Sequence, residues 1–219
     1  MLATEILAQF RELTDDLASP YLFSDASVLR YMNNAENEAA RRARLLVDSS
    51  TAEVTKYSIG IGKSWLTLDP RVVFVKRFMI TGQTLPIGRA HRDDMDILVP
   101  GWEDDTGTIL AYVPNMETGK LRLYRTTDKA YVAKLTVVRT PLNPITISTE
   151  PEINPRYHDK LVHWMLYEAY MKNDSESFNG KKAVDHLALF EQEFGQRSSA
   201  LNETWIEEQR DSFSHEGTF

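Results

Sequence analysis

Apolar residues near the start of the chain recur with the spacing of an α-helix. One stripe consists of Ile6, Phe10, Leu13 and Leu17, and Ser19-Pro20 ends it. Ser24 is a suitable N-cap for a second helix. The stripe of that helix consists of Val28, Met32, Ala35, Ala39, Ala43 and Leu46. The spacing predicts a long amphipathic helix over residues 25–47, whose small alanines allow close approach of another helix or of a neighbouring subunit.

Between residues 51 and 139 the period of the pattern changes to two. Tyr131, Ala133, Leu135 and Val137 alternate with other residues, and residues 71–80 (RVVFVKRFMI) are rich in β-branched and aromatic side chains. Gly-containing turn signals separate these runs. The pattern predicts roughly six or seven short strands in an antiparallel sandwich or barrel-like sheet. Residues 91–98 are expected to add one or two helical turns.

Helical spacing returns after a proline-rich stretch. Residues 140–155 hold four of the nine prolines and predict an extended linker, with Pro155 in the first turn of the next helix. Apolar residues surround that helix on most sides, which predicts burial on more than one face. A last helix carries Ala183, Leu187, Phe190 and Phe194. It begins either at a cap formed by Asp174 or Ser175 or only after Asn179-Gly180.

The predicted fold class is therefore α+β. Residues 1–50 and 140–195 are expected to form a helical bundle from both ends of the chain, with residues 51–139 inserted as an antiparallel β-sandwich or barrel-like domain. Residues 196–219 are expected to be an extended C-terminal tail.

Charge and composition narrow the function classes. The 219 residues carry a net charge of −7 and no cysteine, so disulfides and thiolate ligands are excluded. No apolar run approaches the length of a membrane span, and the N-terminus lacks the features of a signal peptide. These observations predict a protein that binds no membrane, and they are compatible with a reducing compartment. The acidic balance disfavours a nucleic-acid-binding surface. The one dense basic cluster, Arg41, Arg42 and Arg44, is either a solvated helix face or a surface for an acidic neighbour.

Motifs for nucleotide or metal binding are incomplete. Residues 60–64 (GIGKS) lack the first glycine of a phosphate-binding loop and precede a strand-like run, so we predict a β-hairpin turn there. His158 and His163 are five residues apart and diverge on a helix. The acidic groups at residues 93–96 and 103–105 lack the spacing of a calcium loop and are interpreted as solvated turns. No cofactor or metal is predicted.

Catalytic signatures are also missing from the sequence. No nucleophile stands in a recognisable motif with a base, and no pair of carboxylates marks a cleft. We therefore predict no catalytic residue and a non-enzymatic protein. A cell-wall hydrolase, which would rest only on scattered acids, is the weakest alternative.

Aromatic residues suggest where partners bind. Trp164 is expected in the core or at a subunit contact. Trp205, Phe213 and Phe219 stand in a polar tail, where they are either without fixed structure or anchors for a partner. An alternative function, a glycan- or peptide-binding module, would use Trp65, Trp102 and Tyr112 as an aromatic platform on the β domain.

Three ordered blocks resemble the head-to-tail adaptor proteins of short-tailed bacteriophages. They are residues 31–39 (YMNNAENEA); residues 70–73 (PRVV) with 81–86 (TGQTLP) and 138–141 (VRTP); and residues 155–162 (PRYHDKLV) with 168–170 (EAY) and 174–176 (DSE). The order of the blocks over most of the chain carries the resemblance, because no single block is specific.

The resemblance implies a structural protein that is made in the host cytoplasm and lies at the head–tail junction of the virion. Such adaptors form a ring of about twelve copies on the portal protein. The ring extends the DNA channel, through which DNA passes without specific binding, and docks tail nozzle or fibre proteins. The resemblance makes Trp205, Phe213 and Phe219 candidate portal-binding residues, and Arg41, Arg42, Arg44 and Trp164 candidate subunit contacts.

Overall fold

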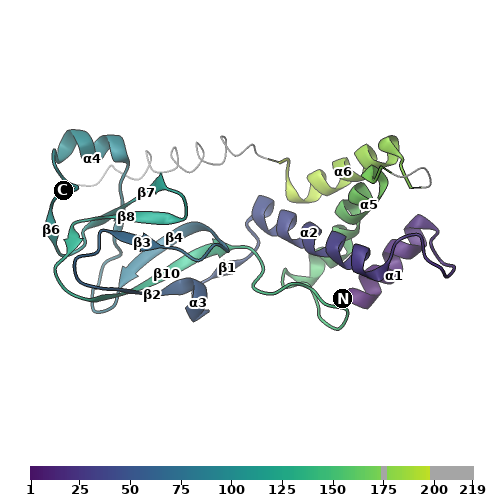
Figure 1. Ribbon diagram of the computed structural model, residues 1–219, viewed down its shortest axis with the longest axis horizontal. Helices are drawn as coiled ribbons and strands as arrows, with labels where there is room; N and C mark the ends of the chain where they lie inside the picture. The colour runs from purple at the N-terminus through teal and green to yellow at the C-terminus, as the bar shows by residue number, and fades with distance from the viewer. Residues whose placement is uncertain (174–176, 198–219) are drawn as a thin grey trace. The chain divides into compact units, whose positions relative to one another are not determined.

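The computed structural model describes residues 1–173 and 177–197, which belong to two compact units (Figure 1). A helical unit comprises Met1–Leu46 and Arg139–Arg197, and a β unit comprises Val47–Val138. The chain is α+β, as predicted. Helical segments from both ends of the sequence thus belong to one unit, and a continuous central segment forms the other.

The helical unit contains four α-helices and one short 3₁₀ helix in its described residues. They are α1 (Ala3–Thr14), α2 (Asp25–Ala43), the 3₁₀ helix η1 (Pro155–Lys160), α5 (Leu161–Met171) and α6 (Gly180–Phe194). Polar caps fix three of the starts. Ser24 accepts a hydrogen bond from the Ser27 amide, Asn154 accepts one from Arg156, and Asn179 accepts one from Lys182. The last helix therefore begins at Gly180, the second of the two predicted starts.

Two helices end earlier than their apolar stripes suggest. α1 stops at Thr14, where Asp15 adopts a left-handed conformation with φ of 57°. Leu13 and Leu17, which we predicted on the buried stripe, are 48% and 65% exposed. α2 ends at Ala43, because Arg44 is left-handed with φ of 51°. A left-handed residue closes a helix whatever the spacing of apolar residues beyond it.

One hydrophobic core joins the helices of the two chain ends. Its buried residues from the first segment are Ala3, Ile6, Phe10, Phe23, Val28, Tyr31, Met32, Ala35, Ala39 and Ala40. Those from the second are Ile145, Ile153, Leu161, Val162, Trp164, Met165, Leu166, Ala169, Tyr170, Ala183, Phe190 and Phe194. Seven of the eleven residues of α5 are buried, which confirms the predicted burial of this helix on several sides.

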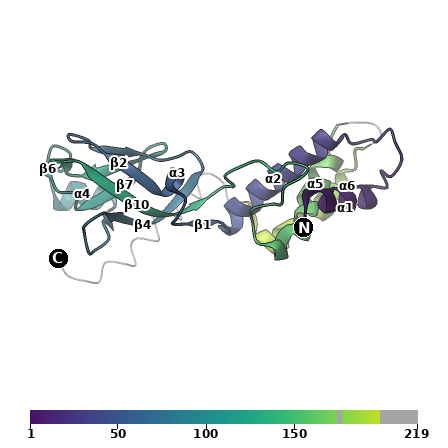
Figure 2. The same ribbon diagram turned by 90° about the horizontal axis from the view of Figure 1, so that it is seen from below.

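The β unit consists of short strands and two short helices. Its strands are β1 (Val47–Asp48), β2 (Lys56–Ile59), β3 (Trp65–Thr67), β4 (Val72–Ile80), β5 (Gly88–Arg89), β6 (Thr106–Gly107), β7 (Ala111–Glu117), β8 (Lys120–Tyr124), β9 (Thr126–Thr127) and β10 (Tyr131–Arg139). Its helices are α3 (Ala52–Thr55) and α4 (Arg92–Leu98), the second within the segment predicted to hold one or two turns. Figure 2 shows the unit from below.

The described strands form three separate sheets rather than one closed barrel. The first has the order β1-β10-β2, with β4 also paired to β10; the second has the order β3-β8-β7-β5; the third pairs β6 with β9. The β5–β7 and β6–β9 pairs are parallel, which corrects the wholly antiparallel arrangement that we predicted. Both pairs include strands of only two residues, which are too short to show an alternating pattern in the sequence. The face-to-face sandwich remains a prediction.

The turn at residues 60–64 does not join two strands of a hairpin. β2 pairs with β10 and β3 pairs with β8, so the turn leads from one sheet to another. Thr127 on β9 holds it instead: its Oγ1 donates to the Gly60 carbonyl at 2.7 Å and accepts from the Lys63 amide at 2.8 Å. The hairpin prediction was wrong because the partner of the turn lies more than sixty residues away in the sequence.

Candidate functional site

Arg42, one of the predicted subunit-contact residues, is buried within its own chain. Its side chain is only 2% exposed. Nε donates to Glu38 at 2.9 Å, and NH1 donates to the Gly195 carbonyl at 3.3 Å. The guanidinium also lies 4.9 Å from the centre of the Trp164 ring. Arg42 therefore ties the end of α2 to α5 and to the end of α6, the point where the chain leaves the helical unit.

The neighbours of Arg42 keep the buried charge neutralised. Arg41, whose side chain is 23% exposed, also donates to Glu38, at 3.1 Å. Burial alone would raise the pKa of Glu38, but the hydrogen bonds from Arg42 and Arg41 outweigh it and hold the pKa below its usual value. Arg44 is half-buried. Arg41 and Arg44 thus retain surface that another subunit could contact.

Trp164 also makes its contacts inside the helical unit. It is 7% exposed, and its Nε1 donates to Glu168 at 3.0 Å. Glu168 also accepts from Asn34 on α2 at 3.1 Å, and burial raises its pKa. The tryptophan ring packs against Phe190 with ring centres 5.1 Å apart. Arg42 and Trp164 together form a cluster that joins α2, α5 and α6. Their role as subunit contacts stays a prediction.

The predicted portal-binding residues Trp205, Phe213 and Phe219 lie outside the described residues.

A second buried carboxylate fixes the proline-rich linker, and the sequence analysis missed it. Glu36 on α2 is 1% exposed and accepts hydrogen bonds from the amides of Glu152 and Ile153. Burial raises its pKa to about 7, against the lowering effect of these two amides. The signal was present in the pattern, because Glu36 stands midway between Met32 and Ala40 on a buried row spaced by four residues.

The two predicted structural histidines have different surroundings. His158 is fully buried, and its Nε2 lies 2.8 Å from the Ile153 carbonyl. Because a carbonyl only accepts, Nε2 must carry the proton. His163 instead faces His186 on α6, with 3.3 Å between the Nδ1 atoms. Burial is the main cause that lowers the pKa of both imidazoles. For His163, the neighbouring His186 lowers the pKa further.

Metal and catalytic candidates gain no support from the geometry. Within residues 1–173 and 177–197, no three His, Asp or Glu side chains gather closely enough to hold a metal ion. Two of the predicted acidic-turn residues make internal contacts: Asp96 accepts from the Trp102 indole at 2.9 Å, and Asp105 accepts from the Tyr124 hydroxyl at 3.2 Å. Over the same described part of the chain, no helix is long and apolar enough to cross a membrane.

The aromatic platform proposed for a glycan-binding module is not exposed. Trp102 is 2% and Tyr112 is 4% exposed. Trp102 and Trp65 both lie 5.5 Å from the guanidinium of Arg122, which is itself buried. Both indole rings thus lie against an internal cation, and Trp65 is the partner of Arg122 across the β3–β8 ladder. This arrangement removes the observation on which the glycan alternative rested.

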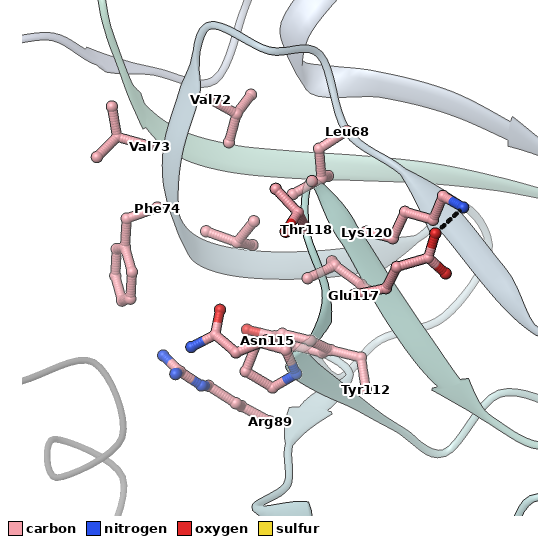
Figure 3. A pocket seen from close by; sticks show the side chains of 14 residues that line it. Leu68, Val72, Val73, Phe74, Arg89, Tyr112, Asn115, Glu117, Thr118 and Lys120 are labelled. Atoms are coloured by element: carbon pink, nitrogen blue, oxygen red, sulfur yellow. Dashed lines mark hydrogen bonds and ion pairs between the residues drawn. The ribbon is translucent and has the colours of Figure 1, made fainter. Parts of the chain in front are cut away.

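A pocket of about 350 Å³ opens in the β unit between β4 and the β7–β8 hairpin (Figure 3). Val72, Val73 and Phe74 on β4 line one side, and a Glu117–Lys120 ion pair lies on the other. Asn115, left-handed with φ of 61°, interrupts β7 at the pocket. The sequence did not predict this pocket because its two sides come from strands about forty residues apart.

Comparison with protein families defines the class of this chain. The family model described as SU10 adaptor protein matches residues 1–214. The chain belongs to the SU10 adaptor protein family, a family of structural adaptor proteins of bacteriophages. No curated protein matches the chain significantly.

Proposed function

We propose that this protein is a subunit of an adaptor ring at the head–tail junction of a phage virion. About twelve copies would attach to the portal protein and extend its DNA channel. The match to the SU10 adaptor family over residues 1–214 carries the proposal. The acidic charge of −7 fits a channel that lets DNA pass without binding it.

The two units supply different parts of this function. The helical unit, which we regard as a bundle, would contact the neighbouring copy. Arg42, which lies over Trp164, donates a hydrogen bond to the Gly195 carbonyl at the end of α6. Trp205, Phe213 and Phe219 further along the chain are the proposed portal anchors, because aromatic residues dominate interface energetics.

Tail nozzle or fibre proteins would dock on the β unit. The pocket between β4 and the β7–β8 hairpin offers apolar side chains from Val72, Val73 and Phe74 beside a charged pair. Such a combination of an apolar recess and a polar rim is typical of protein-binding sites.

Portal binding is tested by mixing the full-length protein with its cognate portal and imaging the complex. We expect a ring of adaptor density on the portal, which disappears when Trp205, Phe213 and Phe219 are all replaced by alanine. A variant with Phe178→Ala, an exposed aromatic in the helical unit, serves as control and should bind normally. Failure of the unchanged protein to bind the portal would refute the proposal.

A further inference from the structure

Three exposed cations gather on one face of a sheet in the β unit. Lys134 is the only exposed residue of β10, and its partner across the ladder is Lys56 on β2, which is also exposed. On β4, Arg77 is exposed; Lys76 is exposed as well but, as the adjacent residue of the strand, lies on the opposite face. We call Lys56, Arg77 and Lys134 the basic patch.

The register brings the patch residues near one another. The amide of Thr81 donates to the Val132 carbonyl at 2.9 Å, which aligns the end of β4 with the start of β10. Arg77 precedes Thr81 by four residues on β4, so it lies about two residues along the ladder from Lys134. Arg77 and Lys134 are therefore diagonal neighbours on the two strands, roughly 7–8 Å apart. Three adjacent strands thus present cations to the same region of solvent.

These cations lack internal compensation. Among the described residues, Lys56, Arg77 and Lys134 make no ion pair and no side-chain hydrogen bond, whereas other cations of the same unit do. Arg71 pairs with Asp69 at 2.8 Å, and Lys120 pairs with Glu117. Like charges directly opposite on a ladder destabilise a sheet. The arrangement is therefore unfavourable in the isolated chain and becomes favourable against an acidic surface.

A matching acidic surface lies elsewhere in the same unit. Asp94 on α4 and Glu103 and Asp104 in the following loop are exposed, and their carboxylates have no partner in the described chain. The Trp102–Asp96 hydrogen bond and the bond from Arg122 to the Glu103 carbonyl fix this loop to α4 and β8. We call these three residues the acidic edge. In Figure 1, α4 lies beside β7, which is a strand of the second sheet. The basic patch lies on β2, β10 and β4, which are strands of the first sheet.

We propose that the basic patch of one copy binds the acidic edge of the next copy. The two surfaces differ, so the contact is head-to-tail and can continue from copy to copy until a ring closes. Nucleic acid is the less favoured partner, because the whole chain is acidic and the patch holds only three cations. The contact would set the register of neighbours and the rate of assembly more than the final affinity. It rests on the proposed ring and specifies one of its interfaces.

Zero-length carbodiimide cross-linking of the full-length protein tests the contact, because it joins only lysines and carboxylates that touch. Equal amounts of ¹⁵N-labelled and unlabelled chain are mixed at low salt, so that hybrid peptides identify links between copies. We expect hybrid links from Lys56 or Lys134 to Asp94, Glu103 or Asp104. They should weaken strongly in about 1 M salt, where the Debye length is about 3 Å. The absence of these hybrid links at low salt would overturn the proposal.

Charge-swapped variants sharpen the test. Lys56→Glu with Lys134→Glu reverses the patch, and Glu103→Lys with Asp104→Lys reverses the edge. Self-association measured by sedimentation should fall about ten-fold in each variant and return when the two are mixed or combined in one chain. Lys63→Glu with Lys129→Glu changes the charge equally outside the patch and should have little effect. Lack of rescue, or loss of DNA binding as the only consequence of patch reversal, would refute the head-to-tail contact.

Portal binding separates this inference from the proposed function. If the patch and edge variants still form complete rings on the portal with unchanged links, the contact is refuted while the adaptor function stands. If the unchanged protein shows the patch-to-edge links but binds no portal, the contact stands and the proposed function fails.

Discussion

Charged residues in the core of the helical unit and those on the outer face of the β1-β10-β2 sheet in the β unit are placed in opposite ways. In the helical unit, Arg11, Glu36 and Arg42 are withdrawn from solvent and paired with groups distant in the sequence. In the β unit, cations such as Lys56 and Lys134 stand exposed and opposite one another. Buried charges must be satisfied within the chain, whereas exposed charges are free to meet a partner. Buried charge therefore helps to hold the helical unit together, whereas we propose that the exposed cations of this sheet serve assembly.

Asp16 offers the strongest test of this difference. It is buried and accepts hydrogen bonds from Arg11 at 2.9 Å and from the Leu22 and Phe23 amides at 2.8 and 3.1 Å. Asp16→Ala leaves a buried guanidinium and two amides without this acceptor, so we expect unfolding to become easier by about 4 kcal/mol. Urea denaturation measures the change. Asp94→Ala on the exposed acidic edge should change stability by less than about 0.5 kcal/mol. Equal effects of the two substitutions would contradict the contrast between the units.

Two adjacent arginines allow a matched comparison within α2. Arg42→Ala removes a buried cation that contacts Glu38, Gly195 and Trp164, and should cost about 3 kcal/mol. Arg41→Ala removes a partly exposed partner of the same glutamate and should cost less than about 1 kcal/mol. Both free energies come from denaturant titration. If Arg41→Ala proves as costly as Arg42→Ala, burial is not what distinguishes them.

Glu36 predicts how stability depends on pH. Its pKa is raised to about 7 by burial, so the folded chain holds this proton more tightly than the unfolded chain. The contribution to stability is therefore complete below the unfolded pKa of about 4.5 and is lost as pH rises through about 7. We expect the stability advantage of the unchanged protein over Glu36→Gln to fall by about 2 kcal/mol between pH 5 and pH 8.

The histidine pair acts in the opposite direction. The lowered pKa values of His163 and His186 mean that stability is lost as pH falls through the unfolded pKa of about 6.5. Comparing Glu36→Gln with the unchanged protein at each pH cancels this contribution, because both chains carry the pair. A difference that does not vary with pH would show that Glu36 keeps an ordinary pKa.

The periodicity of apolar residues predicted those elements in which the apolar face is also the face buried in the fold. α2 has Ser24 as a cap and a buried stripe, and β10 alternates over its whole length, so both were predictable. α5 was predicted as buried on several sides because apolar residues surround it. In each case the property depends on neighbours within the element itself.

What the sequence did not reveal depends on distant partners. Glu36 is satisfied by amides 116 and 117 residues away, and the turn at residues 60–64 is held by Thr127. The basic cluster Arg41, Arg42 and Arg44 looked uniform in the sequence, but Arg42 is 2% exposed and lies over Trp164 and Phe190, whereas Arg41 is 23% exposed. Spacing along one helix gives the face of a residue, but the residue that meets it comes from another part of the chain.

The smallest expected effect concerns the basic patch, and its sign matters more than its size. Lys134→Glu turns a like-charged pair with Lys56 into an oppositely charged one, so the isolated chain should become more stable by roughly 0.5 kcal/mol. Lys134→Gln, which removes the repulsion without adding attraction, should give about half of this gain. Denaturation at low salt measures both gains in stability, and high salt should erase them.

If Lys134→Glu stabilises the chain yet weakens association with a second copy, the unfavourable lysine pair is explained by binding. If it destabilises the chain, the lysines stabilise the fold by themselves, and the distinction between the two units fails at this position.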